Sequence, residues 1–198
     1  MQRLVTFGCS VTYGQGLSDC IRENNMPGFT PSEQAWPSIL ARSLNLPVVN
    51  KAIPGAGNLQ ILNAMLNFEF SKDDVVILMW SYIDREFLFL QNGTRQIASW
   101  TDNELAKKWL EVHDDHDLIM RSWLNIHHGN LLLDNKNIKY YNYFAEYGEI
   151  KQHKPNWFHS PVYDIDVPKL RKIDYANDNR HPGPLAHIEI ARAIERLL

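Results

Sequence analysis

The chain has 198 residues and a formal net charge of −3, with 44% hydrophobic and 22% charged residues. These values are typical of one soluble globular domain over residues 1–198, and no basic tract favours a nucleic-acid or membrane partner. Cys9 and Cys20 are too few for a disulfide framework and lack metal-ligand spacing, so we expect free thiols.

The first half of the chain alternates predicted strands and helices. The strands are predicted at residues 3–8, 47–50 and 75–79, separated by a helix that opens at 32–37 and by a second helix that Asn58 can cap. The run at 75–79 is continuously apolar, which is typical of a central parallel strand with helices on both faces. We therefore predict an α/β fold with a mostly parallel sheet.

The segment 84–135 is longer than a single crossover connection between two parallel strands requires. We interpret it as an insertion followed by helices. Thr101 or Asp102 is predicted to cap a first helix that ends near His113. The second helix is predicted from apolar positions at helical spacing. These positions are Leu118, Ile119, Ser122, Trp123 and Ile126.

The last third of the chain is predicted to hold a fourth strand at 137–144 and a terminal helix at 185–198. Between them, residues 145–180 form a long segment with no clear periodicity. Long loops in compact domains are often functional, so we expect this segment to help wall a site.

Ser10 is the candidate nucleophile. It follows the first predicted strand, and Gly8 allows the sharp turn that would bring it out at the carboxyl end of that strand, where open α/β sheets bind ligands. A serine hydroxyl needs a base and a group that orients this base. Asp178 and His181, three residues apart in a polar segment, can supply the orienting carboxylate and the base.

Three blocks of the sequence, in the same order, resemble the SGNH (GDSL-like) hydrolases. Gly8–Thr12 is similar to the Gly-Asp-Ser block, with Cys9 in place of the aspartate, and Asp178–Pro182 is similar to the closing Asp-x-x-His-Pro block. Asn50–Asn58 is similar to the second block, in which a glycine N–H serves the oxyanion hole. Gly55 matches that glycine, and the Ser10 N–H is expected to serve the same hole.

The third block departs from the family pattern. The family has a Gly-x-Asn-Asp after the third strand, and its asparagine donates to the oxyanion, whereas here 75–79 runs into Trp80-Ser81-Tyr82 without an asparagine. A hydroxyl of Ser81 or, as the second choice, Tyr82 could donate instead. Losing one oxyanion donor typically raises the barrier by ~3 kcal/mol.

The resemblance implies a three-layer α/β/α sandwich, also called flavodoxin-like, that acts as a serine esterase or deacylase without cofactor or metal. It makes a small-molecule or carbohydrate O-acyl ester, such as an acetyl ester, the expected substrate, and acyl transfer to a sugar would use the same site. The alternative is an inactive protein of this fold with a binding or structural role in a viral or surface assembly. Because no leader pattern and no apolar run of ~20 residues is visible, we expect a cytoplasmic protein.

The remaining histidines are interpreted as structural or surface residues. The groups His113–His116 and His127–His128 lack a spacing that would join them in one metal site, so solvated helix faces are expected. His187 lies one turn into the terminal helix and is expected to pack or hydrogen-bond there. Trp36 and Trp123 are expected in the core, while the sequence leaves Trp80, Trp100 and Trp157 open.

Overall fold

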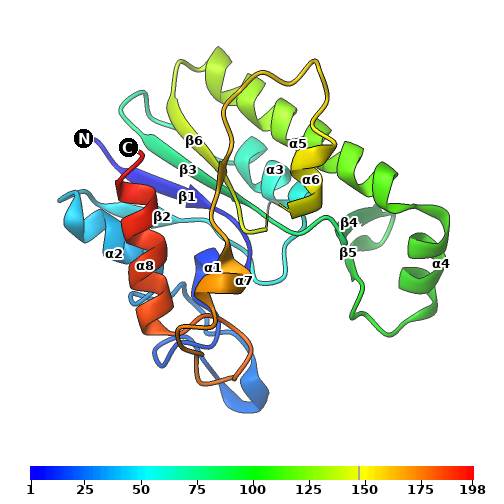
Figure 1. The fold of residues 1–198 in the computed structure, drawn as a ribbon, viewed down its shortest axis with the longest axis horizontal. Coiled ribbons are helices and arrows are strands. Elements are labelled where there is room, and N and C mark those ends of the chain that lie inside the picture. Colours follow the sequence, from blue (N-terminus) through cyan, green and yellow to red (C-terminus); the bar gives the residue numbers. More distant parts are fainter. Residues whose placement is uncertain (147) are drawn as a thin grey trace.

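A five-stranded parallel sheet forms the centre of the protein in the computed structural model, which describes residues 1–146 and 148–198 (Figure 1). Its strand order is β2–β1–β3–β6–β7, and the mostly parallel sheet predicted from the sequence is confirmed. The strands are β1 (Leu4–Phe7), β2 (Val48–Asn50), β3 (Val75–Trp80), β6 (Lys139–Phe144) and β7 (Tyr163–Asp164). All residues of β1 and β3 are buried, as expected for central strands covered on both faces.

Helices cover both faces of this sheet, which confirms the three-layer arrangement (Figure 1). On one side α2 (Trp36–Ser43) packs against α8 (Pro184–Glu195), and on the other α3 (Asn58–Leu66) packs against α5 (Asp115–Asn135). Trp36 and Trp123 are fully buried in the core, as predicted. Each is a large apolar side chain, and burying one stabilises the fold by roughly 2–3 kcal/mol. No helix in the described residues is both long and apolar enough to cross a bilayer.

Asn58 does not cap α3 as predicted. The N-cap residue is Gly57, and the Asn58 side chain is buried, where it bonds to the chain just after β3. Its Oδ1 accepts from the Ser81 N–H at 2.7 Å, and its Nδ2 donates to the Ser81 C=O at 3.3 Å and to Ser122 Oγ at 3.0 Å. The amide satisfies buried backbone groups that would otherwise lack partners, so it ties the end of β3 to α3 and α5.

The stretch 84–135 begins with an antiparallel hairpin that was not predicted. Strands β4 (Arg85–Leu90) and β5 (Gly93–Ala98) form a separate two-stranded sheet. Helix α4 (Glu104–Val112) follows and ends close to the predicted position, but its cap is Asn103, whose side chain accepts from the Ala106 N–H at 2.8 Å. The predicted caps, Thr101 and Asp102, are therefore wrong by one or two positions.

The segment 145–180 is less irregular than expected. It contains α6 (Gly148–Gln152), the short edge strand β7 and α7 (Val167–Leu170), while residue 147 lies outside the described residues. Strand β7 was not predicted, because a strand of two residues is too short to show the alternation of apolar and polar residues that indicates a strand. The remaining short elements are α1 (Ser10–Tyr13) and a 3₁₀ turn at Glu23–Asn25.

His187 is fully buried in α8, where its Nδ1 accepts a hydrogen bond from the Trp36 N–H at 3.1 Å. The structural role expected for this histidine is confirmed. Burial lowers the pKa of His187 to about 4, against the opposing influence of Asp174 and Asp19. The ring therefore stays neutral in the folded protein at neutral pH, and α2 and α8 are joined by an uncharged contact.

We expect this histidine to make stability fall on acidification. Between about pH 6.5, the ordinary histidine pKa, and pH 4, the unfolded chain binds a proton that the folded protein does not, so the free energy of unfolding decreases as the pH falls. The expected loss is roughly 3 kcal/mol at pH 4. Denaturant unfolding between pH 7 and 4 measures it. The His187→Asn variant keeps an acceptor for the Trp36 N–H without titrating, so an equal loss in that variant would contradict the assignment.

Candidate active site

Ser10 lies at the carboxyl edge of the sheet, at the start of α1. The strand order places β2 and β3 on opposite sides of β1, so the chain leaves β1 at the point where the winding direction changes, which is where doubly wound sheets bind ligands. Cys9 is the N-cap residue of α1 and is fully buried without capping through its side chain. Ser10 is 3% exposed and has an N–H at the first helical position, where no intrahelical acceptor is available.

Asp178 and His181 lie in a tight loop that closes on itself. Tyr175 and Pro182 form an antiparallel bridge, and the Ala176 N–H donates to the His181 C=O at 3.0 Å. Within the loop, Asp178 Oδ2 is 2.6 Å from His181 Nδ1. A carboxylate only accepts, so Nδ1 carries the proton and Nε2 is left as the acceptor.

The Asp178 carboxylate is well suited to stay ionised. Burial raises its pKa, but the hydrogen bonds from the His181 N–H at 3.0 Å, from the imidazole and from the Arg180 N–H at 2.9 Å outweigh burial and hold the pKa below its usual value. A carboxylate that accepts several N–H donors is favoured in its charged form. At neutral pH, Asp178 is therefore an anion that orients the imidazole.

Gly16 lets the chain pass directly behind this carboxylate. Its φ is +88°. A Cβ at this position would lie 2.6 Å from Asp178 Oδ2, which is too close for a van der Waals contact, so any side chain here would clash with the carboxylate. The Asn177 N–H donates to the Gly16 C=O at 2.9 Å. Glycine is needed here both for the left-handed backbone and for the close approach.

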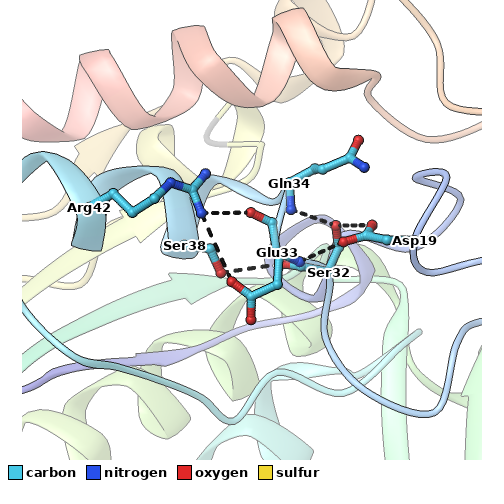
Figure 2. A network of polar contacts seen from close by, with 6 residues as sticks. All are labelled: Asp19, Ser32, Glu33, Gln34, Ser38 and Arg42. Carbon is cyan, nitrogen blue, oxygen red and sulfur yellow. Dashed lines mark hydrogen bonds and ion pairs between the residues drawn. The ribbon is translucent and has the colours of Figure 1, made fainter.

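A polar network joins Asp19, which lies three residues after Gly16, to Ser32, Glu33 and α2 (Figure 2). Asp19 accepts from Ser32 Oγ at 2.5 Å and from the Glu33 N–H at 2.8 Å. Arg42 of α2 donates to the Glu33 C=O at 3.0 Å, and Ser38 Oγ, also in α2, donates to the Ser32 C=O at 3.3 Å. The network ties Asp19 to α2 through Ser32 and Glu33.

One cavity of about 510 Å³ brings most of the predicted site residues together. Ser10, Gly55 and His181 all line it, and Asp178 lies behind His181 with its side chain 2% exposed. Val167 and Arg171 of the 145–180 segment also line it, so this segment does help to wall the site. Within the described residues, Ser10 Oγ makes no hydrogen bond to a protein group. Catalytic hydrogen bonds are often long without substrate and shorten in the complex.

The loop after β2 presents Gly55 to this cavity. Gly55 has φ +74°, and Gln96 of β5 donates to its C=O. The loop is further held by the Ile53 N–H, which donates to the Gly8 C=O at 3.0 Å, and by the Ala56 N–H, which donates to the Ile53 C=O at 3.0 Å. No acceptor in the described part of the chain takes the Gly55 N–H, which leaves this donor available.

Ser81 is placed differently from Tyr82. Ser81 is 1% exposed, is held at both backbone groups by Asn58, accepts from Arg85 Nη1 at 3.4 Å and is not among the residues that line the cavity. Tyr82 does line the cavity, and burial raises its pKa to about 12. Its hydroxyl therefore stays protonated and able to donate at neutral pH.

No protein-family model and no curated protein matches the sequence, whereas solved structures match over nearly the whole chain. A carbohydrate esterase whose active site displays divergent catalytic and non-catalytic binding functions matches with a TM-score of 0.61 and 15% identity over 98% of this chain and 68% of its own. An acetyl xylan esterase from the rumen bacterium Butyrivibrio proteoclasticus matches with a TM-score of 0.63 and 13% identity over 100% of this chain and 63% of its own. The chain thus spans about two thirds of these esterases.

A G-D-S-L family protein from Desulfitobacterium hafniense DCB-2 matches end to end, with a TM-score of 0.57 and 13% identity over 99% of both chains. The chain has the fold of the SGNH (GDSL-like) hydrolases. This SGNH fold accounts for the way in which three separate loops, after β1, after β2 and before α8, meet at one edge of the sheet.

Three arginines and a tryptophan that the sequence reasoning did not assign also line the cavity of this SGNH fold. They are Arg85, Trp100, Arg171 and Arg180. Trp100, which the sequence left open, is 58% exposed, whereas Trp80 is fully buried and donates to Asn142 Oδ1 at 2.9 Å. Arg180 lies inside the Asp178–Pro182 block next to His181, so its place in the sequence was an available signal for its place at the site. In the described residues, no group of three or more His, Cys, Asp or Glu side chains is placed to hold a metal ion.

Proposed function

We propose that the protein is a serine esterase or deacylase that removes a small O-acyl group, such as acetyl, from a carbohydrate. The observation that carries this proposal is the joint placement of Ser10, Gly55 and His181 in one cavity, with His181 bonded to Asp178 at 2.6 Å. The likeness to carbohydrate esterases supports the substrate class.

In the proposed mechanism, Ser10 Oγ attacks the carbonyl carbon of the ester while His181 Nε2 takes the hydroxyl proton. The proton then passes from His181 to the oxygen of the leaving alcohol, and an acyl-Ser10 intermediate remains. Water attacks this intermediate with His181 again as the base, which releases the acid. Asp178 keeps the proton on Nδ1 and stabilises the imidazolium that forms in each half of the reaction.

The oxyanion is proposed to bind to the Ser10 and Gly55 N–H groups and to the Tyr82 hydroxyl. Neither N–H group has an acceptor among residues 1–146 and 148–198, and Tyr82 is proposed to take the place of the asparagine of the third block. Fixed donors that point to developing charge are among the largest contributions to catalysis. Ser81, the first choice from the sequence, is a weaker candidate because it lies outside the cavity lining.

We expect Tyr82→Phe to lower kcat for ester hydrolysis by about 10²-fold with little change in KM, because an oxyanion donor acts mainly in the transition state. Steady-state hydrolysis of 4-nitrophenyl acetate measures this. Ser81→Ala is the matched comparison, since it also removes one hydroxyl after β3. A larger loss in Ser81→Ala than in Tyr82→Phe would return the donor role to Ser81.

The proposed function is tested by exposure of the protein to a fluorophosphonate, followed by intact mass measurement and peptide mapping. An activated serine is expected to give one adduct, on the peptide that contains Ser10, together with release of acetate from acetylated xylose. The absence of an adduct on folded protein, with no acetate released, would reject the esterase and favour the alternative of a binding protein that keeps this fold.

A further inference from the structure

The wall of the active-site cavity is positively charged, although the chain as a whole is negative. Arg85, Arg171 and Arg180 line the cavity, and no aspartate or glutamate of the described residues is part of the lining. The formal net charge of the chain is −3, so this concentration of arginine is opposite to the overall balance. Charges of one sign that line a low-dielectric cleft raise the local concentration of ligands with the opposite charge.

Arg85 is held in place before any ligand binds. Its guanidinium lies over two aromatic rings, with its central carbon 4.3 Å from the Tyr82 ring centre and 4.6 Å from the Trp100 ring centre. Contact with two aromatic faces restricts the orientation of the guanidinium plane. Within the described part of the chain, its one side-chain hydrogen bond is the 3.4 Å contact to Ser81 Oγ, and its Nε is buried without a partner.

An unpartnered buried N–H of a charged group is costly unless a ligand satisfies it. The Nε of Arg85 belongs to the guanidinium edge that pairs with two oxygens of a carboxylate or phosphate at once. An anion that bound to this edge of the guanidinium would satisfy the unmet donor.

Arg171 and Arg180, which lie near the C-terminal end of the chain, add two exposed positive charges to the cavity. Arg171 follows α7 and donates through Nη1 to the Arg180 C=O at 3.3 Å, while Arg180 immediately precedes His181. Across residues 1–146 and 148–198, none of the three arginines forms an ion pair with a carboxylate within 4.0 Å. The three charges are thus available to the cavity.

We propose that the ester accepted by this site carries a carboxylate or phosphate group, as in an O-acylated uronate or an O-acylated sugar phosphate, and that Arg85, with Arg171 and Arg180, binds this group. The inference rests on the proposed function, which it extends to the substrate class. The aromatic and cationic wall would hold the anionic part of the substrate, and Ser10 would attack the acyl group at the other end.

Hydrolysis of three matched esters tests the proposal. The esters are acetylated glucuronate, acetylated glucose 6-phosphate and acetylated methyl glucoside, compared by kcat/KM at low ionic strength and in 0.5 M NaCl. We expect the better of the two anionic esters to exceed the neutral ester at least tenfold, and the ratio to fall in salt because exposed charges are screened. The anionic ester that shows the larger ratio identifies the group. A ratio near one at low salt for both anionic esters would overturn the inference.

Arginine variants locate the effect. Arg85→Gln and Arg171→Gln are expected to lower the anionic-to-neutral ratio severalfold, and Arg85→Lys to restore only part of it because an ammonium cannot make the two-pronged contact. Lys172→Gln removes an equal charge next to Arg171 but outside the cavity lining, and is expected to keep the ratio. If Arg85→Gln does not fold, the exposed Arg171 still provides the test. Equal ratios in the wild type and Arg171→Gln would then overturn the role of this charge.

Binding separates this inference from the proposed function. Calorimetric titration of the wild type with glucuronate, glucose 6-phosphate and methyl glucoside needs no catalysis. Tighter binding of an anionic sugar, combined with no fluorophosphonate adduct, would reject the esterase and keep the anion site. An adduct on Ser10, combined with equal binding of all three sugars, would keep the esterase and reject the anion site.

Discussion

Ser10→Ala is expected to abolish fluorophosphonate labelling and to lower kcat for ester hydrolysis by roughly 10⁵- to 10⁶-fold. In the proposed mechanism no other group forms the acyl intermediate, so removing Oγ eliminates the covalent route and leaves only the catalysis contributed by the oxyanion donors and substrate binding. The measurement is intact mass after labelling, together with single-substrate kinetics of the same preparations.

The fold is expected to tolerate this change. Ser10 Oγ makes no hydrogen bond to a described residue, so its loss leaves no protein donor or acceptor without a partner. Denaturant unfolding of Ser10→Ala should therefore agree with the wild type within about 1 kcal/mol. Residual labelling of folded Ser10→Ala at the wild-type rate would show that another residue is the nucleophile.

Asp178→Asn is expected to lower kcat by about 10⁴-fold while substrate binding changes little. The amide has nearly the shape of the carboxylate, but it can present an N–H to the ring and then stabilises the tautomer with its proton on Nε2, which cannot act as the base. The loss of the anion also removes stabilisation of the imidazolium. Pre-steady-state acylation by 4-nitrophenyl acetate measures the step directly.

One comparison variant makes the Asp178 result specific. Asp174→Asn alters a nearby carboxylate that accepts from the Leu185 and Ala186 N–H groups at 2.9 and 2.8 Å at the start of α8, away from the His181 ring nitrogen. This variant is expected to lose stability but far less kcat than Asp178→Asn. Equal losses of kcat in the two variants would mean that Asp178 acts through the fold and not through His181.

Most of the site could be predicted because its residues come in short segments with strong local signals. Gly8 and Ser10 directly follow an apolar strand, and Asp178 and His181 are close enough in sequence to bond within one loop. Contacts between residues that are close in sequence depend on local backbone geometry, and a short sequence motif is enough to predict them. The parallel sheet was predictable for the same reason, since β3 is a continuous apolar run.

The cavity wall could not be predicted in this way because its parts are distant in sequence. The contact of Arg85 with the Tyr82 and Trp100 rings depends on the β4–β5 hairpin, which returns the chain to the site after fifteen residues. The dipeptide Asn92-Gly93 is a strong hairpin signal that was available but not used. The position of Ser81, whose backbone is held by the buried Asn58 amide, could not be predicted because no periodicity indicates this contact.

The hydrogen bond from Gln96 to the Gly55 C=O means that the hairpin supports both halves of the site. Through Arg85 and Trp100 it shapes the side that would recognise the substrate, and through Gln96 it contacts the loop that carries Gly55, the proposed oxyanion donor. Diversification of substrate preference within this scaffold is therefore constrained. A homologue could exchange the hairpin for another recognition element only if the replacement also supplied a donor for the Gly55 carbonyl, so selectivity and turnover are expected to evolve together here.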